Sequence, residues 1–358
     1  MNRIAAVVSL LLAASSAVAQ DAVFQKPKRW TFQGEGLLRE EWTRDFPSGT
    51  DTDRFRARAL PGLRLTLGPV VLGAAGDFQW SSDENVVAGQ PLIRDNYDSR
   101  DARVDLAFAR LETGPLDLAA GRFEMPIVFT EMIWDRDLRP QGGALTLGLR
   151  DRGSLRRLAV TALGAHGSHV FDDDDTTMLS GALDARFALG GSWRLELLGA
   201  FVTWLDQEKL EAKIRRQNTR VAGAIVRDYE VVDAVVRFRR DGSVPVQVVA
   251  DGCLNTAVDD QRRGLWLSAI VGATQSTRAR LEYVYAFVDR DATLGAYATD
   301  DFIWATGWTG HKADLGFALG RHVALHGIGQ VQRFKDSAVV AERADWIKRF
   351  RVELRLKS

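Results

Sequence analysis

The sequence predicts an all-β protein: a closed, antiparallel, up-and-down transmembrane barrel of about sixteen strands. Three observations support this prediction. Apolar and polar residues alternate with a period of two, short turns alternate with long polar connections, and no apolar run beyond the N-terminal segment could cross a bilayer as a helix. Only every second residue of a barrel strand faces lipid, so such a chain has no long hydrophobic stretch.

The period-two pattern is strongest near the N-terminal end. Residues 54–59 and 63–67 place arginines on one face and apolar side chains on the other, and similar segments recur at 70–81, 281–287 and 350–356. A helix would spread these charges around its whole circumference, so the segments are predicted to be strands. Strands are expected to begin near residues 30, 53, 70, 101, 115, 144, 155, 178, 193, 230, 244, 264, 278, 310, 322 and 345.

Short and long connections alternate between these strands. Short turns are expected at Gly68-Pro69, Gly114-Pro115, Gly190-Gly191 and Gly320-Arg321. Long polar links cover residues 82–100, 124–143 and 289–309. Outer-membrane barrels combine short periplasmic turns, long outer loops and an even strand number. A soluble β-sandwich is the alternative, and tryptophans near the strand ends favour the barrel: Trp30, Trp42, Trp80, Trp193, Trp204 and Trp346.

One segment departs from the alternation. In residues 206–217, Leu210 and Ile214 lie four positions apart with charges between them, which predicts a short helix. We expect this helix in an outer loop, and insertion into the lumen is the alternative.

The first nineteen residues are expected to be a signal peptide. Arg3 supplies a positive charge, residues 4–14 are apolar, and Ala17-Val18-Ala19 matches a small-x-small cleavage site. A helix of the mature protein is the alternative. Residues 20–358 are then expected to form one barrel domain in the outer membrane, with both termini in the periplasm.

Composition and motifs exclude several other classes. Lys plus Arg and Asp plus Glu number 47 each, so no basic excess indicates nucleic-acid binding, and Cys253, as the one cysteine, excludes an intramolecular disulfide framework. Searches for hydrolase, metalloprotease and phosphate-loop motifs find none, so we expect no enzyme, no catalytic residue and no cofactor. His166, His169 and residues 172–175 match no defined metal-binding spacing, so we expect no metal site.

If the apolar face of the barrel meets lipid, the polar face lines the lumen. The residues expected to line it are Arg54, Arg56, Arg58, Arg64, Asp77, Arg103 and Asp105. The third long link carries four carboxylates that would face this arginine row if the link folded inward as a constriction loop: Glu124, Glu131, Asp135 and Asp137. Such an arrangement produces a transverse field that favours polar and charged solutes. A loop that caps the outer rim is the alternative.

Several segments resemble a bacterial porin family. Residues 121–126 (Gly-Arg-Phe-Glu-Met-Pro), then residues 134–138 and Gly142, resemble its Gly-Arg, Pro, Asp-x-Asp and Gly positions. Residues 246–255, 283–287, 299–302 and 310–312 resemble its late strands and loop, so the likeness extends patchily over roughly residues 100 to 335. A weaker resemblance to phosphate-selective porins depends on residues 121–126 and the arginine row.

The resemblance implies an outer-membrane barrel that conducts small solutes, and it carries no binding residue across. We therefore expect a water-filled channel for passive diffusion of small hydrophilic solutes or ions, with a leaning toward anions. Its expected partners are outer-membrane lipid, lipopolysaccharide and the solutes, and a homotrimer would suit sixteen strands by analogy with general porins. A closed barrel that acts as a receptor, adhesin or structural protein is the alternative function.

Overall fold

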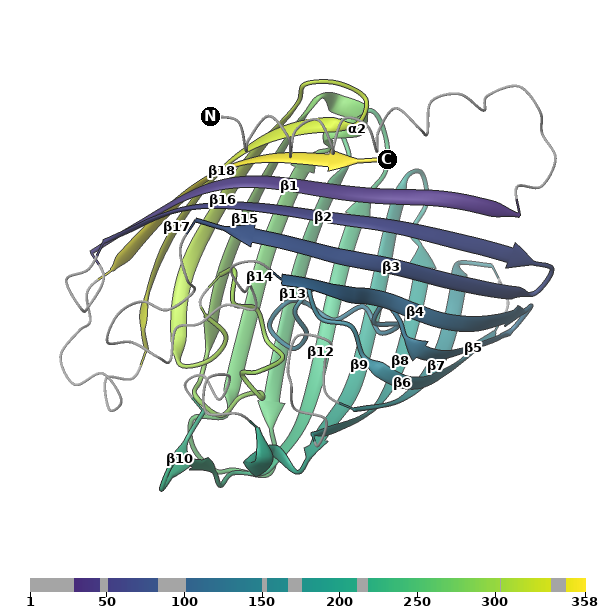
Figure 1. Ribbon diagram of the computed structural model, residues 1–358. Coiled ribbons are helices and arrows are strands. Elements are labelled where there is room, and N and C mark those ends of the chain that lie inside the picture. Colours follow the sequence, from purple (N-terminus) through teal and green to yellow (C-terminus); the bar gives the residue numbers. More distant parts are fainter. Residues whose placement is uncertain are drawn as a thin grey trace.

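Sixteen strands form one closed antiparallel barrel (Figure 1). Each strand pairs with the barrel strands that precede and follow it along the chain, and β1 pairs with β18 to close the barrel. The computed structural model describes residues 29–45, 51–82, 101–149, 153–166, 176–210, 218–302, 304–335 and 346–358. The barrel strands are β1 (Trp30–Arg44), β2 (Thr52–Leu67), β3 (Val70–Ser81), β4 (Asp101–Thr113), β5 (Leu116–Arg122), β6 (Gln141–Leu149), β7 (Leu155–His166), β8 (Thr177–Ala188), β9 (Trp193–Leu205), β12 (Tyr229–Arg240), β13 (Val246–Asn255), β14 (Arg263–Gly272), β15 (Ala279–Val288), β16 (Trp308–Ala318), β17 (Val323–Phe334) and β18 (Ile347–Lys357).

The predicted all-β, closed, antiparallel up-and-down barrel of sixteen strands is confirmed. The strands begin close to the predicted positions, and the largest difference is at β6, which begins at Gln141 instead of residue 144. Between β9 and β12, the predicted helix is replaced in part by the 3-10 turn η1 (Gln207–Lys209), and residues 211–217 lie outside the described part of the chain. A two-stranded hairpin follows, formed by β10 (Arg220–Val221) and β11 (Ala224–Ile225).

Helix contributes little to the described residues. The short α2 (Thr274–Thr277) connects β14 to β15. Within the ranges that the structure describes, no helix has the length and hydropathy needed to span a bilayer.

The alternation in the sequence separates an apolar outer face from the barrel interior. On β3, the outward side chain of Phe78 is 51% exposed, whereas Asp77 beside it is 0% exposed. Large apolar side chains are exposed on strands all around the barrel, and they include Trp30, Leu72, Leu118, Leu183, Val236, Leu267, Leu315 and Phe350. Such an exposed apolar surface is large for a protein in water.

Two connections fold into the barrel and pack against each other. They are the β5–β6 loop (residues 123–140) and the β15–β16 loop (residues 289–302 and 304–307). Asp135 N donates to Tyr297 O at 2.7 Å, and Thr299 N donates to Glu131 O at 2.8 Å. The rings of Trp134 and Tyr297 stack with centroids 5.4 Å apart. The two loops therefore form one packed unit inside the barrel.

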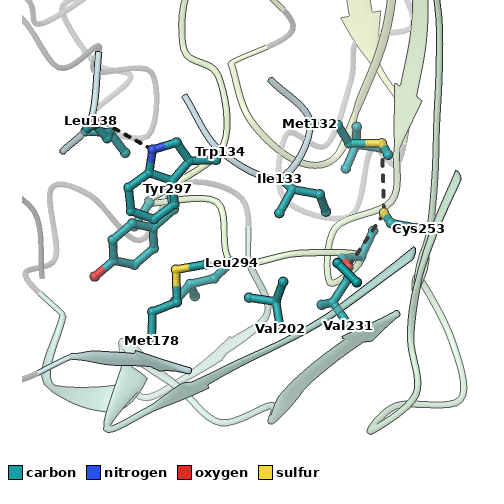
Figure 2. Close-up of a cluster of buried hydrophobic side chains, with 14 of the residues drawn as sticks. Met132, Ile133, Trp134, Leu138, Met178, Val202, Val231, Cys253, Leu294 and Tyr297 are labelled. Carbon is teal, nitrogen blue, oxygen red and sulfur yellow. Dashed lines mark hydrogen bonds between the residues drawn. The ribbon is translucent and has the colours of Figure 1, made fainter. Parts of the chain in front are cut away.

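An apolar core joins this loop unit to the barrel wall (Figure 2). The wall contributes inward side chains that include Met178, Val202 and Val231, and the loops contribute Ile133 and Leu294. The sequence predicts a polar inner face, whereas most of the buried inward side chains on β8, β9 and β12 are apolar. The reason is that they contact the loops rather than an aqueous lumen.

Candidate functional site

Buried charges such as Asp233, Asp251 and Asp314 lie on β12, β13 and β16, but the largest group of inward charges lies on one side of the barrel, on β1 to β4 and β18. We call this group the charged wall, and its members are Arg39, Glu41, Arg54, Arg56, Arg58, Asp77, Arg103, Asp105, Arg349, Arg351 and Glu353. Strand register places opposite charges directly across from each other, because Glu41 pairs with Arg54 on β2 and with Arg351 on β18. Cross-strand pairs of opposite charge stabilise a sheet, so these strands present a dense ion network in which seven arginines face four carboxylates.

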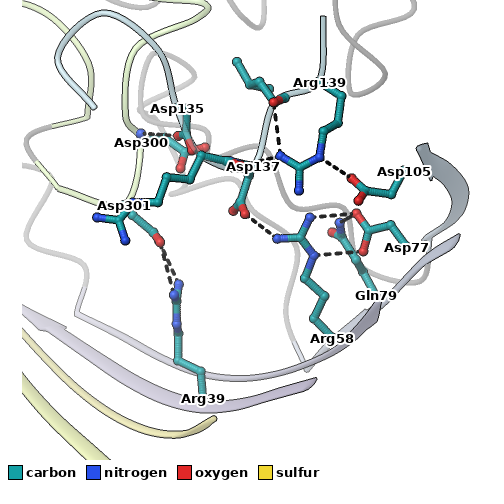
Figure 3. A network of polar contacts seen from close by, with 12 residues as sticks. Arg39, Arg58, Asp77, Gln79, Asp105, Asp135, Asp137, Arg139, Asp300 and Asp301 are labelled. Carbon is teal, nitrogen blue, oxygen red and sulfur yellow. Dashed lines mark hydrogen bonds and ion pairs between the residues drawn. The ribbon is translucent and has the colours of Figure 1, made fainter. Parts of the chain in front are cut away.

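Arg58 is the contact between the charged wall and the β5–β6 loop (Figure 3). Its guanidinium donates to both carboxylate oxygens of Asp77, at 2.8 and 2.9 Å, and its Nη1 contacts Asp137 Oδ1 of the loop at 2.5 Å. Arg103 reaches the same Asp77 at 3.3 Å. A forked guanidinium can bind two carboxylates at once, so Arg58 fixes the loop to the wall.

A β-bulge supplies the second attachment. The register of β3 against β4 shifts at Ala75 and Gly76, which leaves Asp105 as the extra residue of the bulge, between Val104 and Leu106, with its side chain buried in the barrel. Its carboxylate lies 3.1 Å from Arg139 Nε, at the end of the β5–β6 loop. Both ion pairs hold the same stretch of the loop, residues 137–139, against the wall.

The other predicted residues lie elsewhere. Arg64 is near the opposite end of β2, 3.6 Å from Glu112, and contacts none of the loop residues by a hydrogen bond or ion pair within the described ranges. Glu131 forms an ion pair with Arg136 of its own loop, and Glu124 is exposed. Of the four predicted loop carboxylates, Asp137 is therefore the one that meets the arginine row.

Asp135 is buried and binds backbone rather than arginine. Its Oδ1 accepts from Asp137 N at 2.9 Å, and its Oδ2 accepts from Asp300 N at 3.2 Å, so one carboxyl group connects the two loops. Burial raises the pKa of Asp135 well above its usual range, and the neighbouring carboxylates of Asp300, Asp137 and Glu131 raise it further.

This pKa predicts a pH-dependent stability. A carboxyl whose folded pKa is raised stabilises the fold most below the usual Asp value of about 3.9, and that stability is lost as pH rises through the folded pKa. We expect the melting temperature of the wild type to fall more between about pH 4 and pH 7 than that of D135N, whose amide cannot ionise. Circular dichroism in detergent measures this, and parallel curves for the two proteins would contradict it.

The β15–β16 loop provides a contact that the sequence did not reveal. Asp301 accepts two bonds from Arg39, at 2.8 and 3.1 Å, and lies 3.1 Å from Arg351 Nη1. Its backbone carbonyl accepts from Gln330 at 3.0 Å and from Arg349 at 3.2 Å. Asp137 and Asp301 thus bind the charged wall at two places, each from a different inserted loop (Figure 3).

The buried side-chain amide of Asn218 binds the backbone at the start of the β15–β16 loop. Asn218 Nδ2 donates to the carbonyls of Arg290 and Thr293, at 2.8 and 2.9 Å, and its Oδ1 accepts from Gly295 N at 2.7 Å. Three bonds to three backbone groups specify the loop conformation. No sequence motif marked this asparagine.

Of the histidine and aspartate cluster, the structure describes His166. His166 Nδ1 is 3.1 Å from Thr177 Oγ1, whereas His169 and residues 172–175 lie outside the described residues. Within the described ranges, no group of three His, Cys, Asp or Glu side chains could hold a metal ion.

Comparisons with known proteins identify the fold. No protein-family model matches the chain, and no curated protein is a significant relative. Among solved structures, OprB of Pseudomonas putida at high pH superposes with a TM-score of 0.59 at 11% identity, covering 92% of this chain and 94% of the other. Its low-pH structure gives a TM-score of 0.53 at 11% identity, covering 92% of each chain.

A tryptophan-substituted mutant of the Rhodobacter blastica porin matches with a TM-score of 0.51 at 11% identity, over 92% of this chain and 100% of the other. At such low identity these likenesses show the fold alone. The chain has the closed sixteen-strand barrel architecture of these bacterial porins.

Proposed function

We propose that this chain is an outer-membrane porin, a channel for passive diffusion of small hydrophilic solutes or ions. The observation that carries the proposal is the position of the β5–β6 loop: it lies inside a closed barrel, and its Asp137 contacts Arg58 of the charged wall. A loop that narrows the barrel beside fixed charges produces a selective constriction. The exposed apolar outer face supports membrane insertion, and the porin-like fold supports the same function.

The surroundings of the barrel follow from this function. Residues 1–19 act as the export signal and residues 20–358 form the barrel, with both termini in the periplasm. Lipid and lipopolysaccharide contact the outer face, and a homotrimer suits a barrel of this size. Arg54, Arg56, Arg58, Asp77, Arg103 and Asp105 line the constriction, and Arg64 lines the lumen nearer the β2–β3 turn.

Single-channel conductance tests the proposal. The refolded protein in a planar bilayer under a salt gradient should show stable open-channel steps, with a reversal potential that indicates preference for anions. R54S should shift this potential toward cations, because one positive charge is lost while Glu41 keeps its contact with Arg351 at 2.5 Å. R64S is the matched control, and we expect a smaller shift because Arg64 is remote from the loop.

The alternative function, a closed barrel that acts as a receptor, adhesin or structural protein, is favoured by one observation. Several side chains of the charged wall are nearly inaccessible, with Arg56 at 0% and Glu353 at 1% exposure, and the inserted loops fill much of the opposite side. A folded sample whose gel mobility changes on heating but which gives no conductance steps would support this alternative and contradict the porin proposal.

A further inference from the structure

Asp301 occupies a position that resembles a bound ligand. Its carboxylate is held by the guanidinium groups of Arg39 and Arg351, which come from β1 and β18. Paired, forked donors are the usual protein site for a free carboxylate or phosphate. Asp301 itself belongs to the inserted β15–β16 loop and not to the wall. The wall therefore supplies the site and the loop supplies its occupant.

The site has more positive than negative charge. We define the Asp301 cluster as Arg39, Arg54, Arg349 and Arg351 with Glu41, Glu353 and Asp301, so four guanidinium groups face three carboxylates. Loss of the Asp301 charge would leave four against two. Partial burial opposes ionisation of Asp301, but Arg39 and Arg351 outweigh it and hold the pKa of this carboxyl well below its usual range.

Two arginines in the cluster retain unused donors. Arg349 Nε and Arg351 Nη2 have no hydrogen-bond partner among the described residues, and both side chains are buried. Arg349 lies over the Trp304 ring, 4.0 Å from its centroid, and Trp304 belongs to the inserted loop. Unsatisfied buried donors are costly, so these atoms favour an additional oxyanion or a tightly held water.

Asp301 is also more exposed than the arginine side chains that bind it. Its side chain is 31% exposed, whereas that of Arg351 is 2% exposed. A solute in the lumen would thus meet the carboxylate first and reach the arginines only by replacing it. Because Asp301 is carried by a loop, a substitution of this residue removes its charge without altering any strand pairing.

We propose that Arg39, Arg349 and Arg351 form an oxyanion-binding subsite of the pore, and that Asp301 occupies this subsite as a built-in competitor. The ligand class is a small solute with a carboxylate or phosphate group. As a channel subsite it depends on the porin function proposed above. Asp301 is then a specificity-determining residue, because its charge decides how long an anion stays at the constriction.

The test is the D301N variant in planar bilayers. D301N should raise the anion-to-cation permeability ratio about threefold or more, because one unit of negative charge is removed beside the conduction path. Millimolar inorganic phosphate should reduce the chloride current of D301N far more than that of the wild type, and acetate should act more weakly. D260N is the matched control, since Asp260 is an exposed loop residue paired with Arg227 outside the cluster. Its selectivity should equal that of the wild type.

The R349Q variant changes the charge of the same site in the opposite direction. It removes one positive charge, so the permeability ratio should move toward cations, and R349Q/D301N should lose the phosphate block. A folded D301N with wild-type selectivity and no phosphate block would overturn the subsite.

A wild type that gives no conductance steps would contradict the porin function but not the subsite. A binding measurement would then test the subsite. Isothermal titration of inorganic phosphate into detergent-solubilised D301N should give saturable heat that R349Q/D301N lacks. Absence of that heat would also overturn the proposal.

Discussion

Replacement of Trp134 by alanine should raise the single-channel conductance and lower the thermal stability of the barrel. The Trp134 ring stacks on Tyr297, and the Tyr297 ring stacks on Trp204 of β9 with centroids 6.1 Å apart. Trp134 Nε1 also donates to Leu138 O at 3.2 Å, within the stretch of the loop that is attached to the wall. Removal of a buried Trp costs about 3–5 kcal/mol, and here the loss falls on the contact between the two inserted loops.

Both readouts are needed for this variant. If the loops separate, the lumen widens, so larger conductance steps should accompany a lower melting temperature. V128A is the control on the same loop, because the Val128 side chain is 50% exposed and should change neither quantity. A destabilised W134A with unchanged conductance would mean that the loop pair does not limit the pore.

The barrel could be predicted because each strand carries its own signal. Alternation on β2 and β3 gave the strand positions and placed Arg58 and Asp77 on the same face, and the structure pairs these two side chains at 2.8 Å. A hairpin joins them through a short turn, so sequence proximity was enough. An arginine of this row also contacts a carboxylate of the β5–β6 loop, because Arg58 pairs with Asp137. The run of acidic residues in this loop was the sequence signal for that contact.

The second inserted loop could not be predicted by the same reasoning. Asp301 is 262 positions from Arg39, and the site exists only because β1 closes against β18. The sequence does contain one signal for it. The link that begins at residue 289, which we predict to be polar, contains four large apolar residues: Leu294, Tyr297, Phe302 and Trp304. Large apolar residues in an outer link are costly in water, so their presence indicates burial. Alternation alone also could not show that inward valines such as Val231 meet a loop rather than water.

Substitution of Gly142 by alanine should impair folding of the barrel far more than the same change at Gly143. A Cβ on Gly142 would lie against the carbonyl oxygen of Gly164 and 2.7 Å from the Cα of Ala165, both backbone atoms of β7. A Cβ on Gly143 has its nearest contact, Ala119 O, at an ordinary 3.8 Å. The two variants share the lost flexibility of glycine, so the difference between them isolates the steric contact, which we expect to cost roughly 1–3 kcal/mol.

The position of Gly142 connects this steric effect to the constriction. Gly142 pairs directly with Gly121, and the β5–β6 loop begins and ends beside this pair, where Phe123 N donates to Pro140 O at 3.2 Å. Separation of β6 from β7 would therefore also shift the base of the loop that carries Asp137. We expect G142A to need less urea to unfold in detergent and to give broader conductance steps, with G143A close to the wild type. Equal urea midpoints for the two variants would contradict this prediction. They would show that the β7 backbone can shift to accept the added Cβ without loss of stability, so the Gly121–Gly142 pair would not fix the base of the loop.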